Sequence, residues 1–230
     1  MKPQKAEQLI RDLLADPEGF DAKGRGYDLL QAYFAGLPLE TLRPLLRSQV
    51  PLVRRAAAFV ASELGSQACS LLDDVIPLLA SGNRHLQYHA MEVLAVCSEG
   101  ERAEAFVQVV RELESDDDVL RALAMRLVSN ADLSQLEAAR RRLNPSDPRQ
   151  RKHEQALVTL MAAGRVEPAV VAAMIGDVQP LVRRYGAIAA KRLFRELPHL
   201  FTMVGASDDA DLQRFYQRVI EAERSATPHA

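Results

Sequence analysis

Histidine and glutamate side chains at helical spacing are the first candidates for chemistry in this sequence. His85 and His89 are four residues apart, and Glu92 lies seven residues after His85. On a helix this spacing places all three side chains along one face, as metal ligation from a single helix requires. A complete site would still need ligands from a neighbouring element. We therefore expect partly buried, hydrogen-bonded histidines, with metal binding as the alternative.

The basic stretch of residues 140–152 is the second candidate. It contains Arg140, Arg141, Arg142, Arg149, Arg151 and Lys152. These side chains could bind phosphates, or they could be a solvated helix end and linker. The sequence has no glycine-rich phosphate loop, no Ser or Cys in an activating context and no pair of acids at acid-base spacing. We predict no catalytic residue, no cofactor and no bound metal.

A recurring apolar register indicates the elements that position these residues. In Leu52–Leu64, with Leu52 as slot 0, apolar residues occupy slots 0, 1, 4, 5, 8, 9 and 12, and the stretch from Leu181 fills the same slots. Stretches from His85 and Val119 follow the register in part. The starts at 52, 85, 119 and 181 are 33, 34 and 62 residues apart, the last being about two repeats. A period of this length is typical of an α-solenoid, in which each helix pair buries its apolar stripe against the next.

Proline, glycine and capping residues separate the apolar segments and predict paired helices. The predicted helices span residues 4–15, 27–35, 39–47, 52–64, 68–80, 85–97, 101–113, 119–129, 132–143, 148–163, 166–175, 179–194, 198–204 and 208–223. The pair at 132–163 is degenerate, because Arg151, Lys152 and Gln155 occupy apolar slots. We predict an all-α solenoid of about six helix pairs, forming a single domain over residues 1–224, with a disordered tail at 225–230.

Composition excludes some classes of function. The formal charge of −2 and the pI near 6.2 argue against general adhesion to nucleic acids or membranes. The first 14 residues contain no long apolar run, so we expect neither a signal peptide nor a membrane span, and we predict a cytoplasmic protein. The two cysteines, Cys69 and Cys97, are expected to be reduced and buried as small apolar residues.

A phrase shared by three repeats resembles the HEAT-repeat family. It reads Ser48-x-x-Pro51-x-Val53-Arg54-x-x-Ala57, with related phrases from Asp117 and Asp177, and the resemblance covers roughly residues 37–195. It implies a right-handed superhelix with the second helix of each pair on the concave side. It also implies a ladder of hydrogen bonds between turn aspartates and helix arginines, here Asp117 or Asp118, Asp177, Arg54, Arg121 and Arg183, which Gln87 interrupts.

HEAT-like enzymes provide two further comparisons. Iron-dependent hydroxylases of this kind use several His-Glu dyads, whereas this sequence has only His153-Glu154. HEAT-like DNA glycosylases of alkylation repair use a basic concave face and tryptophans, and this sequence contains no tryptophan. A DNA-binding protein that resembles these glycosylases remains the alternative prediction.

The open face of the second helices, slots 3, 6, 7 and 10, provides the candidate binding residues. Aromatic, methionine and arginine side chains are enriched at protein interfaces, although some of these could instead pack against neighbouring helices. The predicted binding residues are Arg55, Phe59, Tyr88, Met91, Glu92, Met125, Arg126, Arg184 and Ile188. We predict a non-catalytic protein-binding module, either an adaptor or a bacterial toxin-neutralising immunity protein. Its partner would be another protein; nucleic acid is the less favoured partner and a membrane is not expected.

Overall fold

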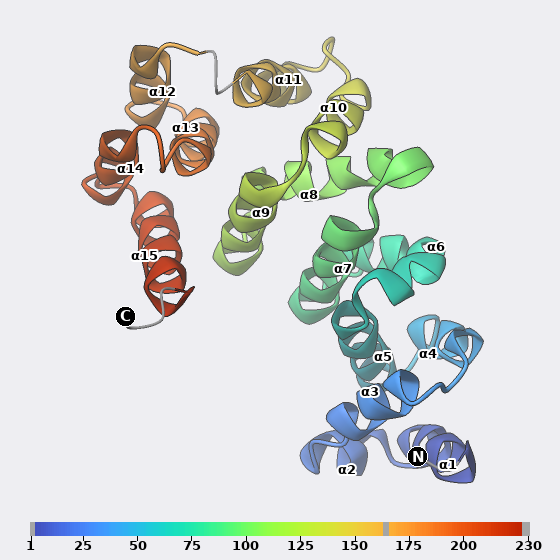
Figure 1. The fold of residues 1–230 in the computed structure, drawn as a ribbon. Helices are drawn as coiled ribbons and strands as arrows, with labels where there is room; N and C mark the ends of the chain where they lie inside the picture. Colours follow the sequence, from blue (N-terminus) through green and yellow to red (C-terminus); the bar gives the residue numbers. More distant parts are fainter. Residues whose placement is uncertain (1–2, 163–165, 227–230) are drawn as a thin grey trace. The chain divides into compact units, whose positions relative to one another are not determined.

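Every element that the structure describes is helical. The structure is a computed structural model that describes residues 3–162 and 166–226, and no strand occurs within these ranges (Figure 1). The predicted all-α class is therefore confirmed. The chain divides into two compact units, Met1–Cys97 and Ser98–Ala230. The single domain predicted over residues 1–224 stays a prediction.

Unit 1 consists of short helices that alternate with longer ones. The longer helices α1, α3, α5 and α7 agree with the predicted ranges to within one or two residues. The elements are α1 (Pro3–Ala15), α2 (Pro17–Ala22), α3 (Gly26–Phe34), η1 (Leu39–Thr41), α4 (Arg43–Leu46), α5 (Pro51–Glu63), η2 (Gly65–Leu71), α6 (Leu72–Val75), η3 (Ile76–Ala80) and α7 (Arg84–Cys97).

Unit 2 has the same alternation. Its elements are η4 (Gly100–Phe106), α8 (Val107–Arg111), η5 (Glu112–Glu114), α9 (Asp118–Asn130), α10 (Leu133–Arg141), α11 (Pro148–Met161), α12 (Pro168–Ile175), α13 (Pro180–Arg192), α14 (Pro198–Gly205) and α15 (Ala210–Ala226). The predicted tail of residues 225–230 begins inside α15, so Ser225 and Ala226 are helical, and residues 227–230 lie outside the described part of the chain.

Capping residues and prolines start most of the long helices. Pro51 and Pro180 occupy first-turn positions of α5 and α13, where a missing N–H costs no hydrogen bond. Asp117 accepts from the first backbone N–H groups of α9, and Asp132 forms a capping box with Gln135 at the start of α10. These local signals explain why the predicted starts of these helices are nearly correct.

One helix was missed, and three predicted helices are interrupted. The first predicted helix ends at Ala15 as expected, but the Asp16 side chain accepts from the backbone N–H of Gly19 and starts α2, which was not predicted. The leading helices at 39–47, 68–80 and 101–113 are split into short α and 3₁₀ pieces. Gly65 and Gly100 begin two of these segments at φ values of +56° and +55°, which interrupts regular helix at those points.

The packing of unit 2 departs from a strictly linear order of second helices. Helix α9 packs against both α13 and α15, while α11 packs against α10 and α13. In a regular array the second helices pack in sequence order, so α11 would pack against α9. The departure occurs at the degenerate repeat, where Arg151 and Lys152 of α11 are exposed in slots that are apolar elsewhere. The loss of register in the sequence thus coincides with a change of packing partner.

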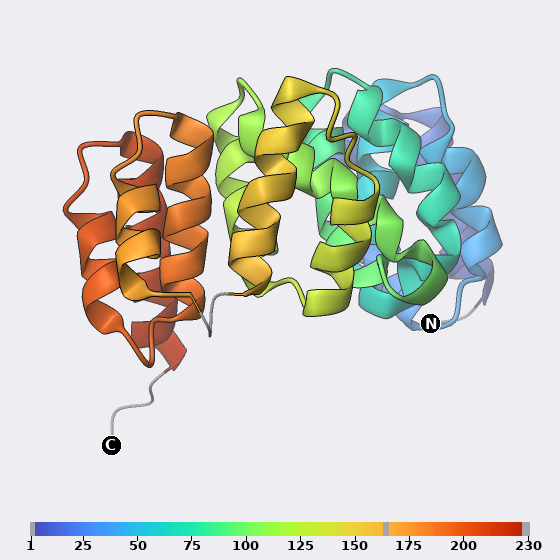
Figure 2. The same ribbon diagram turned by 90° about the horizontal axis from the view of Figure 1, so that it is seen from above.

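Helices α12 to α15 lie side by side (Figure 2). A glycine permits a close approach between α12 and α13. A Cβ atom on Gly186 of α13 would lie 2.7 Å from the backbone nitrogen of Ile175 in α12. The absence of a side chain at this position therefore sets the distance between α12 and α13.

The cysteine prediction was also wrong. Cys69 and Cys97 form a disulfide, with their Cα atoms 4.9 Å apart, that joins η2 to the end of α7 within unit 1. The sequence could not show this pair, because 28 residues separate the cysteines and only the packing of η2 on α7 brings them together. The cytoplasmic location rested partly on reduced cysteines and stays a prediction.

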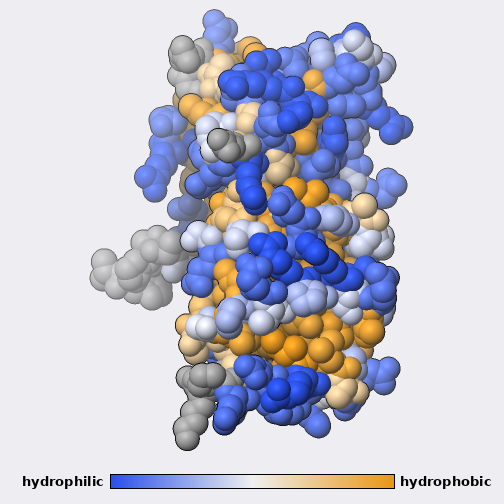
Figure 3. Space-filling model, turned by 90° about the vertical axis from the view of Figure 1, so that its right-hand side faces the viewer, coloured by the Kyte–Doolittle hydropathy of each residue, from blue (hydrophilic) through white to orange (hydrophobic). Residues whose placement is uncertain are grey.

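The described helices include none that is long and apolar enough to cross a membrane. Hydrophilic residues cover much of the face drawn in Figure 3, and hydrophobic residues form several patches on it, the largest in the lower half of the view.

Candidate functional site

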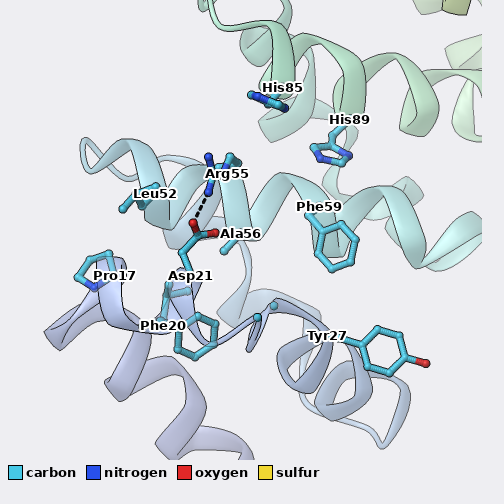
Figure 4. Close-up of a pocket in the computed structure, with 13 residues that line it drawn as sticks. Pro17, Phe20, Asp21, Tyr27, Leu52, Arg55, Ala56, Phe59, His85 and His89 are labelled. Carbon is cyan, nitrogen blue, oxygen red and sulfur yellow. Dashed lines mark ion pairs between the residues drawn. The ribbon is translucent and has the colours of Figure 1, made fainter.

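A groove in unit 1 is lined by side chains of five helices. It has a volume of about 340 Å³, and Figure 4 shows its aromatic, cationic and histidine side chains around one space. Helices α1 and α2 contribute apolar residues and one carboxylate, and α3, α5 and α7 contribute the remainder. The lining residues are Leu13, Pro17, Phe20, Asp21, Gly24, Gly26, Tyr27, Leu52, Arg55, Ala56, Phe59, His85 and His89.

An ion pair crosses the groove between α2 and α5. Arg55 lies 2.5 Å from the Asp21 carboxylate, and both side chains are partly exposed (Figure 4). Asp21 reaches this position because Asp16 caps α2 and orients it beside α5. An ion pair that faces water contributes little to stability, so a binding partner can compete for either member at low cost.

His89 is the most perturbed group in the groove. Burial lowers its pKa from the ordinary 6.5 to about 4, and the nearby charges of His85 and Arg55 lower it further. Its ring packs edge to face with Phe59 at 5.9 Å between centroids. His89 is therefore neutral at pH 7.

The tautomer of His89 follows from its hydrogen bond. The Ser62 hydroxyl donates to the carbonyl of Phe59 at 2.8 Å, and the same oxygen lies 2.9 Å from His89 Nδ1. Because a hydroxyl has one proton, Ser62 Oγ accepts from Nδ1–H. The Nε2 atom of His89 is then an acceptor, suited to a hydrogen-bond donor on a ligand.

The two histidines do not complete a metal site. His85 is exposed and His89 is half-buried, and the carboxylate that lines the groove with them, Asp21 of α2, pairs with Arg55. Within residues 3–162 and 166–226, no group of three or more His, Cys, Asp or Glu side chains could hold a metal ion. The groove instead provides aromatic side chains, the ring nitrogens of His85 and His89, and the ion pair between Arg55 and Asp21.

The predicted binding residues separate into groups. Arg55 and Phe59 line the groove, while Tyr88 and Glu92 are half-exposed on α7 outside the set that lines it. Arg126 is exposed on α9 in unit 2. Arg184 is held in an ion cluster within unit 2.

Three of the predicted binding residues are wrong, because they are buried. Met91, Met125 and Ile188 have no exposed surface. Slot 6 of the register is buried in all four repeats, by Ala58, Met91, Met125 and Ala187. Other helices cover each second helix on more than one side, so its buried face is wider than the apolar stripe of the sequence indicates.

The ion cluster of unit 2 is centred on Asp211. Its carboxylate accepts from Arg121 at 2.9 and 3.1 Å, from Arg184 at 3.1 and 2.9 Å, and from Arg214 at 3.0 Å. Burial by itself would raise the pKa of Asp211, but the hydrogen bonds and charges of Arg121 and Arg184 lower it. The cluster joins α9, α13 and α15, and the role of Arg184 is to hold these helices together.

Two arginines of the implied ladder do bind turn groups. Arg121 donates to the carbonyls of Ser115 and Asp116, and Arg183 donates to those of Asp177 and Val178. Their carboxylate partners lie in or just before α15, Asp211 for Arg121 and Asp209 for Arg183. The implied aspartates Asp117 and Asp177 instead accept backbone N–H groups at helix starts. In contrast, Arg54 Nε is buried without a hydrogen-bond partner in the described part of unit 1.

Three arginines of the basic stretch pair with nearby acids, while Arg149, Arg151 and Lys152 are exposed. Arg140 pairs with Glu137 and Glu154, Arg141 pairs with Glu137, and Arg142 pairs with Glu104. The hydrogen bond from Arg140 is the main cause that lowers the pKa of Glu137 to about 2. Arginines held in this way are poorly placed to release counter-ions from a nucleic-acid backbone.

A buried polar relay in unit 2 was missed by the sequence analysis. His153 Nδ1 lies 2.9 Å from the Tyr185 hydroxyl, and His153 Nε2 lies 3.2 Å from Glu114 Oε2. In the sequence His153 lies beside Glu154 and Tyr185 fills an apolar slot of the stretch from Leu181, but their contact depends on the packing of α11 on α13. Burial lowers the pKa of His153, although Glu114 acts in the opposite direction. Tyr185 and His153 are buried, whereas the Glu114 side chain at the other end of the relay is 38% exposed.

Comparisons with known proteins do not assign the chain to a family. No protein-family model matches it, and no curated protein matches it. Among solved structures, it is similar to an engineered protein of known crystal structure, with 18% sequence identity and a TM-score of 0.42 over 81% of this chain and 96% of that chain. A similarity at this level carries no argument about function.

Proposed function

We propose that this chain is a non-catalytic protein-binding module and that the groove of unit 1 is its contact surface. The observation that carries the proposal is the exposure of aromatic surface around a concave site. Tyr27 is 62% exposed and lies at the edge of a groove that also contains Phe59 and Arg55. Tyrosine and arginine are the residue types that most often dominate binding energy at protein interfaces.

The chemistry of the groove indicates what the partner presents. Phe20, Phe59 and Tyr27 form an apolar surface that would accept an aromatic or aliphatic side chain. Arg55 would release Asp21 and form an ion pair with a carboxylate of the partner. Nε2 of His89 would accept a hydrogen bond from a donor of the partner. Either of the two functions predicted from the sequence, an adaptor or an immunity protein, would use such a surface to bind a protein.

Nucleic acid is the weaker proposal for the partner. Arg184, which was predicted on the open face of the second helices, is held by Asp211, and Arg140 to Arg142 are paired with glutamates. These engagements support a protein partner over DNA. The HEAT-repeat family is carried forward as a proposal on the resemblance of the repeats alone. The cytoplasmic location is carried forward as a separate proposal from the sequence.

A matched pair of variants on α3 tests the proposal. Tyr27 lines the groove, whereas Phe34, which is 49% exposed on the same helix, does not. A partner captured from the source cells with wild-type protein should be lost with Tyr27→Ala and retained with Phe34→Ala. With the purified partner, Tyr27→Ala should weaken binding by about 2 kcal/mol, roughly 30-fold, by calorimetry.

The opposite pattern would reject the proposal. If Tyr27→Ala and Phe59→Ala bind the purified partner as tightly as Phe34→Ala does, the groove is not the contact surface. If instead duplex DNA binds tightly and its affinity falls steeply between 50 and 200 mM salt, the alternative function is correct.

A further inference from the structure

Two adjoining hollows in unit 2 lie between the C-terminal parts of α9, α13 and α15. One has a volume of about 220 Å³ and the other about 420 Å³. Both are lined by Ser129, Asn130, Lys191, Val219 and Glu223, so they form a joined site around Lys191. Neither is part of the groove in unit 1.

The smaller hollow has an apolar floor. Phe215, Val219, Ala122 and Ala222 line it, and Phe215 belongs to the core of unit 2. Its volume is below the roughly 300–1,000 Å³ of sites for drug-sized ligands. A single hydrocarbon chain or one apolar side chain is the size of group that it can take.

Cationic side chains surround this floor and the adjoining hollow. The joined site is lined by Arg126, Lys191, Arg192, Arg195 and Arg218, against the two carboxylates Glu196 and Glu223. The chain as a whole carries a formal charge of −2. The site is therefore a local region of positive charge on an acidic protein, which favours an anion.

Lys191 occupies the junction of the two hollows. Its Nζ donates to the neutral side-chain amide of Asn130 at 2.6 Å. Burial is the main cause that lowers the pKa of Lys191, the charge of Arg192 adds to this effect, and Glu223 opposes it. An anion beside Lys191 would offset the unfavourable burial of its charge.

Arg192 has a structural role, which distinguishes it from Lys191. Its guanidinium donates to the carbonyls of Ser129 at 3.5 Å and Ala131 at 2.7 Å, at the C-terminal end of α9. Capping of α9 explains the presence of Arg192. It does not explain Lys191, Arg195 and Arg218 around an apolar hollow.

We propose that the joined hollow of α9, α13 and α15 binds a small carboxylate that carries an apolar group, with the carboxylate at Lys191 and the apolar group against Phe215 and Val219. A free medium-chain acid and the C-terminal residue of a peptide share this chemistry. The site goes beyond the proposed protein-binding groove and does not depend on it.

Matched ligands test the proposal on the wild-type protein. Sodium octanoate and octanol differ only in the charged end, and acetyl-Ala-Leu with a free carboxylate differs from its amide in the same way. Titrations followed by NMR should shift the methyl signals of Val219 and Ala222. At least one carboxylate should bind roughly tenfold more tightly than its neutral counterpart, as expected for a charge-assisted hydrogen bond. The carboxylate that binds identifies the source of the ligand.

Variants test the assignment to Lys191. Lys191→Gln should reduce carboxylate affinity roughly tenfold, to the level of the neutral ligand. Lys152→Gln, at an exposed lysine of α11 outside the site, should leave it unchanged. Equal binding of charged and neutral ligands overturns the proposal, as does shifting of signals away from Val219. Binding of duplex DNA through Lys191, with no carboxylate binding, also overturns it. The ligand comparison on wild-type protein decides the matter even if Lys191→Gln fails to fold.

Discussion

Replacing Asp211 with alanine should strongly destabilise unit 2. The Asp211 side chain is 9% exposed and accepts hydrogen bonds from Arg121, Arg184 and Arg214. Its removal leaves the guanidinium groups of Arg121 and Arg184, which are mostly buried, without their shared carboxylate. Breaking a buried ion cluster by removing one partner costs about 3–5 kcal/mol.

Urea unfolding followed by far-ultraviolet circular dichroism measures this loss. Asp208→Ala is the matched control, because Asp208 is an exposed aspartate in the same turn before α15. The control should change the free energy of unfolding by no more than about 0.5 kcal/mol. A loss below about 1 kcal/mol for Asp211→Ala would refute the view that this cluster holds α9, α13 and α15 together.

The pH dependence provides an independent check. The folded pKa of Asp211 is lowered below its ordinary value of 3.8. The carboxylate therefore contributes its full stability above about pH 4, and this contribution is lost as the pH falls through the folded pKa. The difference in the free energy of unfolding between wild type and Asp211→Ala should be constant from pH 8 to pH 5 and should shrink below pH 4. A difference that shrinks already between pH 7 and pH 5 would contradict the assignment.

Three further changes test other features. The pKa of His89 is about 4, below the ordinary 6.5, so the contribution of the neutral ring to the stability of the folded state is complete above pH 6.5. That stability, about 1–2 kcal/mol after allowance for solvent screening, should be lost between pH 6.5 and 4 in urea titrations, and less so in His89→Gln. Gly186→Ala forces its Cβ to within 2.7 Å of the Ile175 backbone and should cost about 1–3 kcal/mol in thermal unfolding. Reducing the Cys69–Cys97 disulfide should lower the free energy of unfolding of the wild type by about 3–4 kcal/mol in urea titrations, and the same reducing agent should leave that of Cys69→Ser unchanged.

The sequence determined the positions of the long helices. Periodic apolar residues with Pro51, Asp117 and Pro180 at the helix starts predicted α5, α9 and α13 to within two residues. These signals are local, because a cap or first-turn proline acts on backbone groups within one turn. The all-α class follows from the same local signals.

The candidate groove could be predicted only in part. Arg55 and Phe59 lie on the open face of α5 as predicted, because helix periodicity fixes which residues share a face. Tyr27 and Asp21 come from α3 and α2, whose packing against α5 is not encoded in any nearby pattern. Met91, Met125 and Ile188 were misplaced for the same reason, since their burial depends on helices distant in sequence.

Tertiary structure alone decided which charged and polar residues meet. Arg121 and Asp211 are 90 residues apart, and His153 and Tyr185 are 32 residues apart. Helix periodicity specifies the face on which each residue lies but not the helix that will cover that face. The sequence therefore showed that arginines and histidines line the second helices, whereas the packing of α9 against α13 and α15 determined which of them are held in the core and which remain open to a partner.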